Sequence, residues 1–178
     1  MDGSNLCAAI FDSRYFNSLF VSFSIKESAT MVAKAAESAG LDFVGVCDHV
    51  AIPDDKYSAH MTTTWYDPVA TLSWIGANTE RIHLLSVVWI AAYRHPLISA
   101  SSFGTLSHLS SGRVILGLGA GHVEGEFKAL NVDFSKRGSI LDESIDVIRN
   151  AFTDEYSTHN GKHFQFQSVG VGPQPPGN

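Results

Sequence analysis

Short apolar runs alternate along the chain with segments in which apolar residues recur every three or four positions. The apolar runs at 41–47, 82–88 and 114–118 predict strands. The segments between them predict amphipathic helices that begin at capping residues or proline. About four strand–helix units follow one another in this way, which is typical of a parallel sheet with crossover helices.

The first strand has two candidate runs in the sequence. Leu6–Phe11 and Leu19–Phe23 are both apolar, and we favour the second because it leads directly into a helix. Ser24 and Glu27 form a capping box at the start of that helix, and Gly40 ends it. The expected buried face of this helix consists of Met31, Val32, Ala35, Ala36 and Ala39.

Proline marks the start of the next two helices. Asp67 followed by Pro68 predicts an N-cap with proline at the first helical position. Pro96 opens a further helix, which Gly112 closes. Its expected buried face includes Ile98, Phe103, Leu106 and Leu109.

The last third of the chain predicts helices followed by a hairpin. A short helix is expected at 124–130, and a longer one contains Leu141, Ile145, Ile148 and Phe152 at helical spacing. Asn160-Gly161 predicts a tight hairpin turn. Residues 167–178 form a glycine- and proline-rich tail that resembles a linker, and residues 1–178 are expected to form a single domain.

A glycine-rich loop follows the strand expected at Val114–Leu118. That strand is expected to be buried on both faces, and the backbone is expected to turn tightly at 119–121. Ligands of α/β proteins bind at the carboxyl ends of the strands, so this loop is a candidate site. A dinucleotide-binding G-x-G-x-x-G starting at Gly117 is excluded, because its last glycine would fall on His122.

Composition and charge indicate an ordinary globular protein. The 178 residues are 44% hydrophobic and 17% charged, and the net charge of −6 argues against a nucleic-acid partner. The two cysteines form no CxxC pair, and no apolar run reaches the length of a membrane span. We therefore expect a cytoplasmic protein with no membrane partner. The histidines have no metal-ligand spacing and no G-x-S-x-G motif occurs, so we also expect no metal and no covalent nucleophile.

Two architectures are compatible with four strand–helix units. They form either a small doubly wound sheet or half of an eight-unit barrel, and composition does not distinguish these folds.

Several motifs, each weak by itself, together resemble the luciferase-like monooxygenase superfamily. They occur in the family's order over roughly residues 27–176. The motifs are Ala36–Val44 leading into Cys47-Asp48-His49, Tyr93–Pro96, Leu106–Arg113, Gly117–Gly121 with Glu126-Phe127, Arg137 with Leu141–Glu143, and the hairpin after Asn160. The 94–96 and 117–121 segments are most similar to the branch that uses the deazaflavin coenzyme F420, with FMN as the alternative cofactor.

The resemblance implies a fold and a set of site residues. The fold is a (β/α)8 TIM barrel, of which this chain would be a truncated half-barrel of about four β/α units. The implied catalytic residue is His49, the substrate-pocket residue is His122, and the cofactor-binding residues are Asp48, Ser86, Val87, Gly119, Ala120 and Gly121. At Ser86-Val87 the resemblance implies a bulge with a non-proline cis peptide behind the cofactor ring.

Simpler interpretations of these residues stay open at this point. A histidine suits proton exchange with an alcohol, but His49 could instead cap Asp48 or the following turn. Arg94-His95 either lines the rim of the pocket or belongs to a helix N-terminal loop. Glu126, Arg137, Asp142 and Glu143 are expected to be structural, as helix caps or exterior ion pairs.

The implied function is hydride transfer to or from a small organic substrate. An FMN-dependent monooxygenase is the alternative enzyme. A hypothesis of another class is an inactive half-barrel that self-associates through its unpaired strand edges, and a homo-oligomer is expected.

Overall fold

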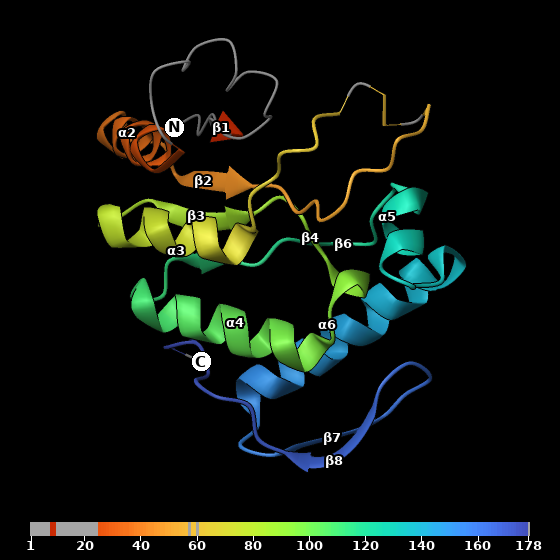
Figure 1. Cartoon of the computed structure of the whole chain (residues 1–178). Helices are drawn as coiled ribbons and strands as arrows, with labels where there is room; N and C mark the ends of the chain where they lie inside the picture. The colour runs from red at the N-terminus through yellow and green to blue at the C-terminus, as the bar shows by residue number, and fades with distance from the viewer. Residues whose placement is uncertain (1–7, 10–24, 57, 60, 178) are drawn as a thin grey trace, which may run out of the picture.

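A computed structural model describes residues 8–9, 25–56, 58–59 and 61–177. Its main sheet is parallel, with the strand order β1-β2-β3-β5, formed by Ala8–Ala9, Phe43–Val46, His83–Ser86 and Val114–Ile115. A second parallel pair consists of β4 (Trp89–Ile90) and β6 (Leu118–Gly119). Figure 1 shows this pair between the main sheet and α5, so the strand direction leads toward α5.

Helices follow the strands in chain order. The helix α2 (Ile25–Ser38) packs on α3 (Pro68–Asn78), which packs on α4 (Pro96–Leu109), and α4 packs on α6 (Arg137–Thr153). The shorter helices are η1 (Ala91–Tyr93), α5 (Glu124–Ala129) and η2 (Phe134–Lys136). The expected parallel sheet with crossover helices is therefore confirmed. No described helix combines the length and apolar character needed to cross a membrane.

The core lies between the parallel strands and α2–α4. Val44, Val46 and Leu84 belong to the same buried cluster as Leu72 and Phe103 of the helices. Strand residues alternate between the two faces of a sheet, so Gly45, Leu85 and Val87 occupy the opposite face. A Cβ at Gly45 would lie 2.6 Å from Val87 Cγ2, and glycine is therefore needed where these residues meet.

Two local capping signals are confirmed, whereas Ser24 of the predicted capping box lies outside the described residues. The Asp67 carboxylate accepts a hydrogen bond from the Ala70 N–H (2.9 Å) at the start of α3. Gly40 adopts φ +75° after α2, where a left-handed residue closes the helix. The hairpin around Asn160-Gly161 is formed by β7 (Ser157–Asn160) and β8 (Gln165–Val169), which pair antiparallel.

The preference for Leu19–Phe23 as the first strand is wrong. Ala8–Ala9, in the other candidate run, pairs parallel with Val44 and Gly45 of β2. The run 19–23 itself lies outside the described residues. Which run pairs with β2 depends on contacts with a strand more distant in the sequence, and the residues next to α2 give no signal of that pairing.

Two helices bury faces that differ from the expected ones. In α2 the buried apolar residues are Ala29, Ala33 and Ala36, whereas Met31 is 44% exposed. In α4, Ile98 and Leu109 are 59% and 72% exposed. The buried side of α4 carries Phe103 and Leu106 together with small residues, which let α3 and α6 approach closely. Packing against α3 and α6 thus buries small residues of α4 and leaves Ile98 and Leu109 exposed.

The strand expected at Val114–Leu118 is divided and is not buried on both faces. The chain forms β5 and β6 with an interruption at 116–117, and Ile115 is 41% exposed because β5 lies at the edge of the main sheet. Gly119 belongs to β6 and pairs with Ile90, so the tight turn comes later than expected. At Gly121 the backbone φ is +82°.

The non-proline cis peptide lies between Val87 and Val88, one bond beyond the position that the resemblance implies. Ser86 still pairs with Val46 of β2, and the Val87 N–H donates to the Val46 carbonyl (2.8 Å). The ladder of β3 therefore extends to the Val87 amide before the chain departs from regular strand geometry.

The tail is shorter than expected, and it packs against the helices. Residues 167–169 belong to β8. The Gln174 carbonyl oxygen lies 2.6 Å from His108 Nε2, and the Gln174 side chain donates to the Ala151 and Asp154 carbonyls. A Cβ at Gly104 would collide with the Pro173 carbonyl, so this glycine leaves room for the tail on α4.

Candidate active site

A cavity of about 220 Å³ lies where three loops meet after the parallel strands. The first loop follows β2, the second joins β3 to η1 through β4, and the third follows β6 and enters α5. This is the carboxyl end of the strands, where α/β proteins bind ligands. The lining residues are Cys47, Asp48, His49, Val87, Val88, Ile90, Tyr93, Gly121, His122, Val123 and Glu126.

The cavity brings together some of the residues that the sequence singled out. Five of them line it, namely Asp48, His49, Val87, Gly121 and His122. Ser86, Gly119 and Ala120 are not among the lining residues. Ser86 is buried and donates to the Gly117 carbonyl (3.0 Å). Gly119 pairs with Ile90, and a Cβ at this position would collide with the Val88 side chain.

His49 is held by a carboxylate that is distant in the sequence. Its Nδ1 lies 2.7 Å from Oε2 of Glu126, a fully buried residue 77 positions away. The His49 ring also lies 4.4 Å from the Trp65 ring and 6.1 Å from the His122 ring, between centroids. Its Nε2 makes no hydrogen bond with any residue in the described part of the chain.

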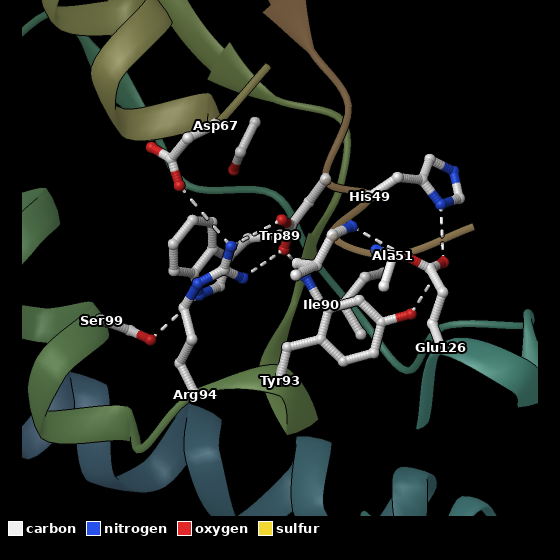
Figure 2. A network of polar contacts seen from close by, with 12 residues as sticks. His49, Ala51, Asp67, Trp89, Ile90, Tyr93, Arg94, Ser99 and Glu126 are labelled. Carbon is white, nitrogen blue, oxygen red and sulfur yellow. Dashed lines mark hydrogen bonds and ion pairs between the residues drawn. The ribbon is translucent and has the colours of Figure 1, made fainter. Parts of the chain in front are cut away.

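Figure 2 shows Glu126 between the His49 ring and the Tyr93 hydroxyl. Tyr93 donates to Glu126 Oε2 (3.1 Å), and the N–H groups of Val50 and Ala51 donate to Oε1 (2.8 and 3.1 Å). The expectation that Glu126 is an exterior or capping residue is therefore wrong. Glu126 lies in the first turn of α5 and contacts both the loop after β2 and Tyr93 of η1, so its side chain lines the cavity.

Hydrogen bonding keeps Glu126 charged in spite of its burial. Burial acts to raise the pKa of this carboxyl, but the hydrogen bonds from His49, Val50 and Ala51 outweigh it and hold the pKa below its ordinary value. Burial and the neighbouring Glu126 charge raise the pKa of Tyr93, so its hydroxyl keeps its proton. The site therefore holds an anionic acceptor beside a neutral tyrosine.

A second buried carboxylate shapes the loop after β2. Arg94 donates to both oxygens of Asp48 (2.7 and 2.9 Å), and the Ile90 N–H donates to Oδ2 (2.9 Å). The Arg94 guanidinium lies 3.7 Å from the centre of the Trp89 ring, and it approaches Asp67 at 3.7 Å. Figure 2 shows this second group beside the first. Of the two open interpretations of Arg94-His95, the structure supports the helix N-terminal loop, because His95 is the N-cap of α4 and neither residue lines the cavity. From this loop Arg94 anchors Asp48.

Sequence reasoning missed Glu126, Tyr93, the pairing of Arg94 with Asp48, and Trp65 as parts of the site. Glu126, Tyr93 and Arg94 belong to the motifs that carried the family resemblance. That membership was the signal in the sequence by which they could have been found. The hydrogen-bond partners of Glu126, Tyr93 and Arg94 lie 33 to 77 residues away, so no local pattern could connect them.

The lining of the cavity suits a largely apolar group better than a phosphate. Val87, Val88 and Ile90 supply an apolar wall, and Gly121 contributes no side chain. No lysine or arginine is among the lining residues that the structure describes, and Arg94 nearby is already paired with Asp48. Within the described ranges, no three His, Cys, Asp or Glu side chains form a group that could hold a metal ion.

A model of the luciferase-like monooxygenase family matches residues 24–178. The F420-dependent glucose-6-phosphate dehydrogenase of Amycolatopsis mediterranei is 31% identical over 150 residues, which cover 80% of this chain and 43% of that protein. The chain spans about half the length of the curated relatives it matches.

Solved structures agree with the architecture. Monooxygenase RslO1 from Streptomyces bottropensis is 25% identical, with a TM-score of 0.73 over 84% of this chain and 43% of that one. The oxygenating constituent of 3,6-diketocamphane monooxygenase from Pseudomonas putida, solved with FMN, is 19% identical with a TM-score of 0.70, over 83% and 40% of the two chains. The fold is thus a partial fragment that matches luciferase-like TIM-barrel structures.

Proposed function

Because the chain belongs to the luciferase-like monooxygenase family, we propose that it takes part in F420-dependent hydride transfer to or from a small organic alcohol or ketone. The observation that carries this proposal is His49, which lines the cavity, is held at Nδ1 by Glu126, and makes no hydrogen bond at Nε2 with the described residues. The 31% identical Amycolatopsis dehydrogenase, F420-dependent by its name, supports the choice of cofactor.

The residues that would hold the cofactor ring are those of the apolar wall and the glycine loop. Val87, Val88 and Ile90 would pack against one face of the ring, and Gly121 would allow the backbone to approach it. Asp48, Ser86, Gly119 and Ala120, predicted from the family resemblance, stay predictions as cofactor contacts. When bound, F420 supplies the hydride acceptor or donor.

The chain's own residues supply the proton chemistry. Oxidation of an alcohol releases its hydroxyl proton, and His49, which lines the cavity, would accept it through Nε2. The Glu126 carboxylate then balances the charge on the imidazolium. His122, whose ring meets the His49 ring at 86°, would contact the substrate. In the reverse direction the same imidazolium returns the proton to the ketone.

An FMN-dependent monooxygenase is the alternative function, supported by the 25% identity to RslO1. Binding titrations of the 178-residue chain with F420 and with FMN, followed by absorbance, distinguish the two. We expect saturable F420 binding and a 1:1 end point. Saturation with FMN and not with F420 would replace the proposal with the monooxygenase.

His49→Ala is the test of the proton-transfer role. Removing a general base costs typically 10²–10⁴-fold in rate, so we expect alcohol oxidation to fall by about that factor while F420 still binds. The control is His83→Ala, since His83 lies exposed on β3 away from the cavity lining. Unchanged oxidation in His49→Ala would contradict the role. Failure of the wild-type chain to bind either cofactor, with association in solution, would favour the inactive half-barrel.

A further inference from the structure

The two oxygens of Glu126 have different partners. Oε1 accepts the backbone N–H groups of Val50 and Ala51, whereas Oε2 faces His49 Nδ1 and the Tyr93 hydroxyl. One oxygen therefore holds the loop that carries His49, and the other contacts the imidazole itself. Figure 2 shows these contacts converging on a single carboxylate.

An ionised carboxylate only accepts hydrogen bonds, so each of its partners must donate. Tyr93 keeps its proton and donates through its hydroxyl. The same requirement at His49 places a proton on Nδ1, because Nδ1 lies 2.7 Å from Oε2. The proton on one ring nitrogen of a neutral imidazole leaves the other nitrogen with a lone pair.

We propose that Glu126 is a positioning residue that fixes neutral His49 in the Nδ1–H tautomer and so makes Nε2 the proton acceptor. The catalytic consequence rests on the function proposed above, whereas the tautomer does not. Glu126 touches neither substrate nor cofactor in this assignment, and acts through His49.

A purely structural role for Glu126, in which it only holds the loop, makes a different prediction. Glu126→Gln separates the two roles, because the amide oxygen can still accept the Val50 and Ala51 N–H groups while the NH₂ group faces His49. The opposite amide orientation would set NH₂ against two N–H donors and is disfavoured. In Glu126→Gln the amide oxygen therefore still accepts the loop N–H groups. Its NH₂ group donates a hydrogen bond to Nδ1, whereas the carboxylate accepted one from it.

The test is the ¹⁵N NMR spectrum of histidine-labelled protein at about pH 8.5, well above the ordinary histidine pKa. His49→Gln identifies the His49 signals by their loss. We expect the wild type to show a protonated Nδ1 and Glu126→Gln to show a protonated Nε2. Tyr93→Phe, which removes the other contact to Oε2, is the matched control and is expected to leave the tautomer unchanged.

Two results would overturn the inference: a wild-type His49 protonated at Nε2, or the same tautomer in wild type and Glu126→Gln. The first result depends only on the wild type and on the assignment variant His49→Gln, so it decides the matter even if Glu126→Gln fails to fold. Kinetics then test the consequence. A reversed tautomer in a comparable acid–histidine pair costs on the order of 10⁴-fold in kcat, and we expect a loss of that order with F420 affinity retained.

The tautomer and the proposed function can fail separately. A tautomer that switches as expected in a protein without F420-dependent activity would leave the positioning role standing and remove the proposed function. Full activity in a Glu126→Gln protein whose tautomer has switched would remove the catalytic consequence alone.

Discussion

Gly121 determines how close the backbone can come to the cavity. Its φ of +82° is in the left-handed region, which residues with side chains rarely adopt. A Cβ there would lie 2.9 Å from Ile90 Cγ2 and from two ring carbons of Phe127. Both the conformation and the packing therefore require glycine, and the residue lies in the cavity lining beside His122.

Gly121→Val is expected to destabilise the fold and to abolish cofactor binding. The strained φ and the overlap with Ile90 and Phe127 together cost on the order of 2–4 kcal/mol. Urea unfolding and the F420 titration measure the two effects. Gly138→Ala is the control, because a Cβ at Gly138 meets nothing within 4 Å, and stability is expected to be unchanged or higher. Wild-type stability in Gly121→Val would contradict this account.

At the scale of elements, one carboxylate holds the β7–β8 hairpin to α6. Glu143 of α6 accepts the N–H groups of Lys162, His163 and Phe164 in the hairpin turn, and it lies 3.1 Å from His159 Nε2. Burial acts to raise the pKa of Glu143, but the hydrogen bonds from Phe164, His163 and His159 outweigh it and lower the pKa. The expectation that Glu143 is structural agrees with these contacts.

Glu143→Ala is expected to cost about 1–3 kcal/mol of stability, because it leaves several turn N–H groups without their acceptor. The neighbouring exposed Asp142→Ala is the control. In the folded protein the pKa of Glu143 is lowered from its ordinary value of 4.5. Its contribution to stability is therefore complete above pH 4.5 and is lost as the pH falls through the folded-state pKa. Urea unfolding should thus show the difference between wild type and variant shrinking below pH 4.5. A difference that grows on acidification would contradict the assigned sign.

At the scale of the whole molecule, the parallel sheet has an edge at β5. In the described part of the chain, β5 pairs with β3 and has no partner on its other side. Unpaired strand edges with exposed apolar residues favour association with another chain. The homo-oligomer expected from the sequence stays a prediction, as does the cytoplasmic location.

Sedimentation of the purified chain should therefore show a species heavier than the monomer, in an amount that depends on concentration. Ile115→Lys places a charge on the edge strand and is expected to shift the chain toward monomer. Leu109→Lys is the matched control, since Leu109 is also exposed but lies at the end of α4. Equal responses of the two variants would exclude β5 as the associating edge.

The fold was predictable where its signals are local. The N-cap at Asp67, the glycine after α2 and the hairpin after Asn160 each depend on a few neighbouring residues, and each is confirmed. The hairpin loop is residues 161–164, however, and not a tight turn at Asn160-Gly161, because Asn160 pairs with Gln165. The choice of first strand was wrong, and the expected buried sides of α2 and α4 were only partly right. Ala36, Phe103 and Leu106 are buried as expected, whereas other expected residues are exposed. These features depend on which distant element packs against them.

The amino-acid sequence by itself determined the alternation of strands and helices from Ile25 onward, the family motifs, and the position of His49 after a strand. Only the tertiary structure decided that Glu126 contacts His49 across 77 residues and that Arg94 pairs with Asp48. The physical reason is that apolar periodicity and turn chemistry act between neighbours in the chain. The partner of a buried charge is instead fixed by which loops meet at the ends of the strands.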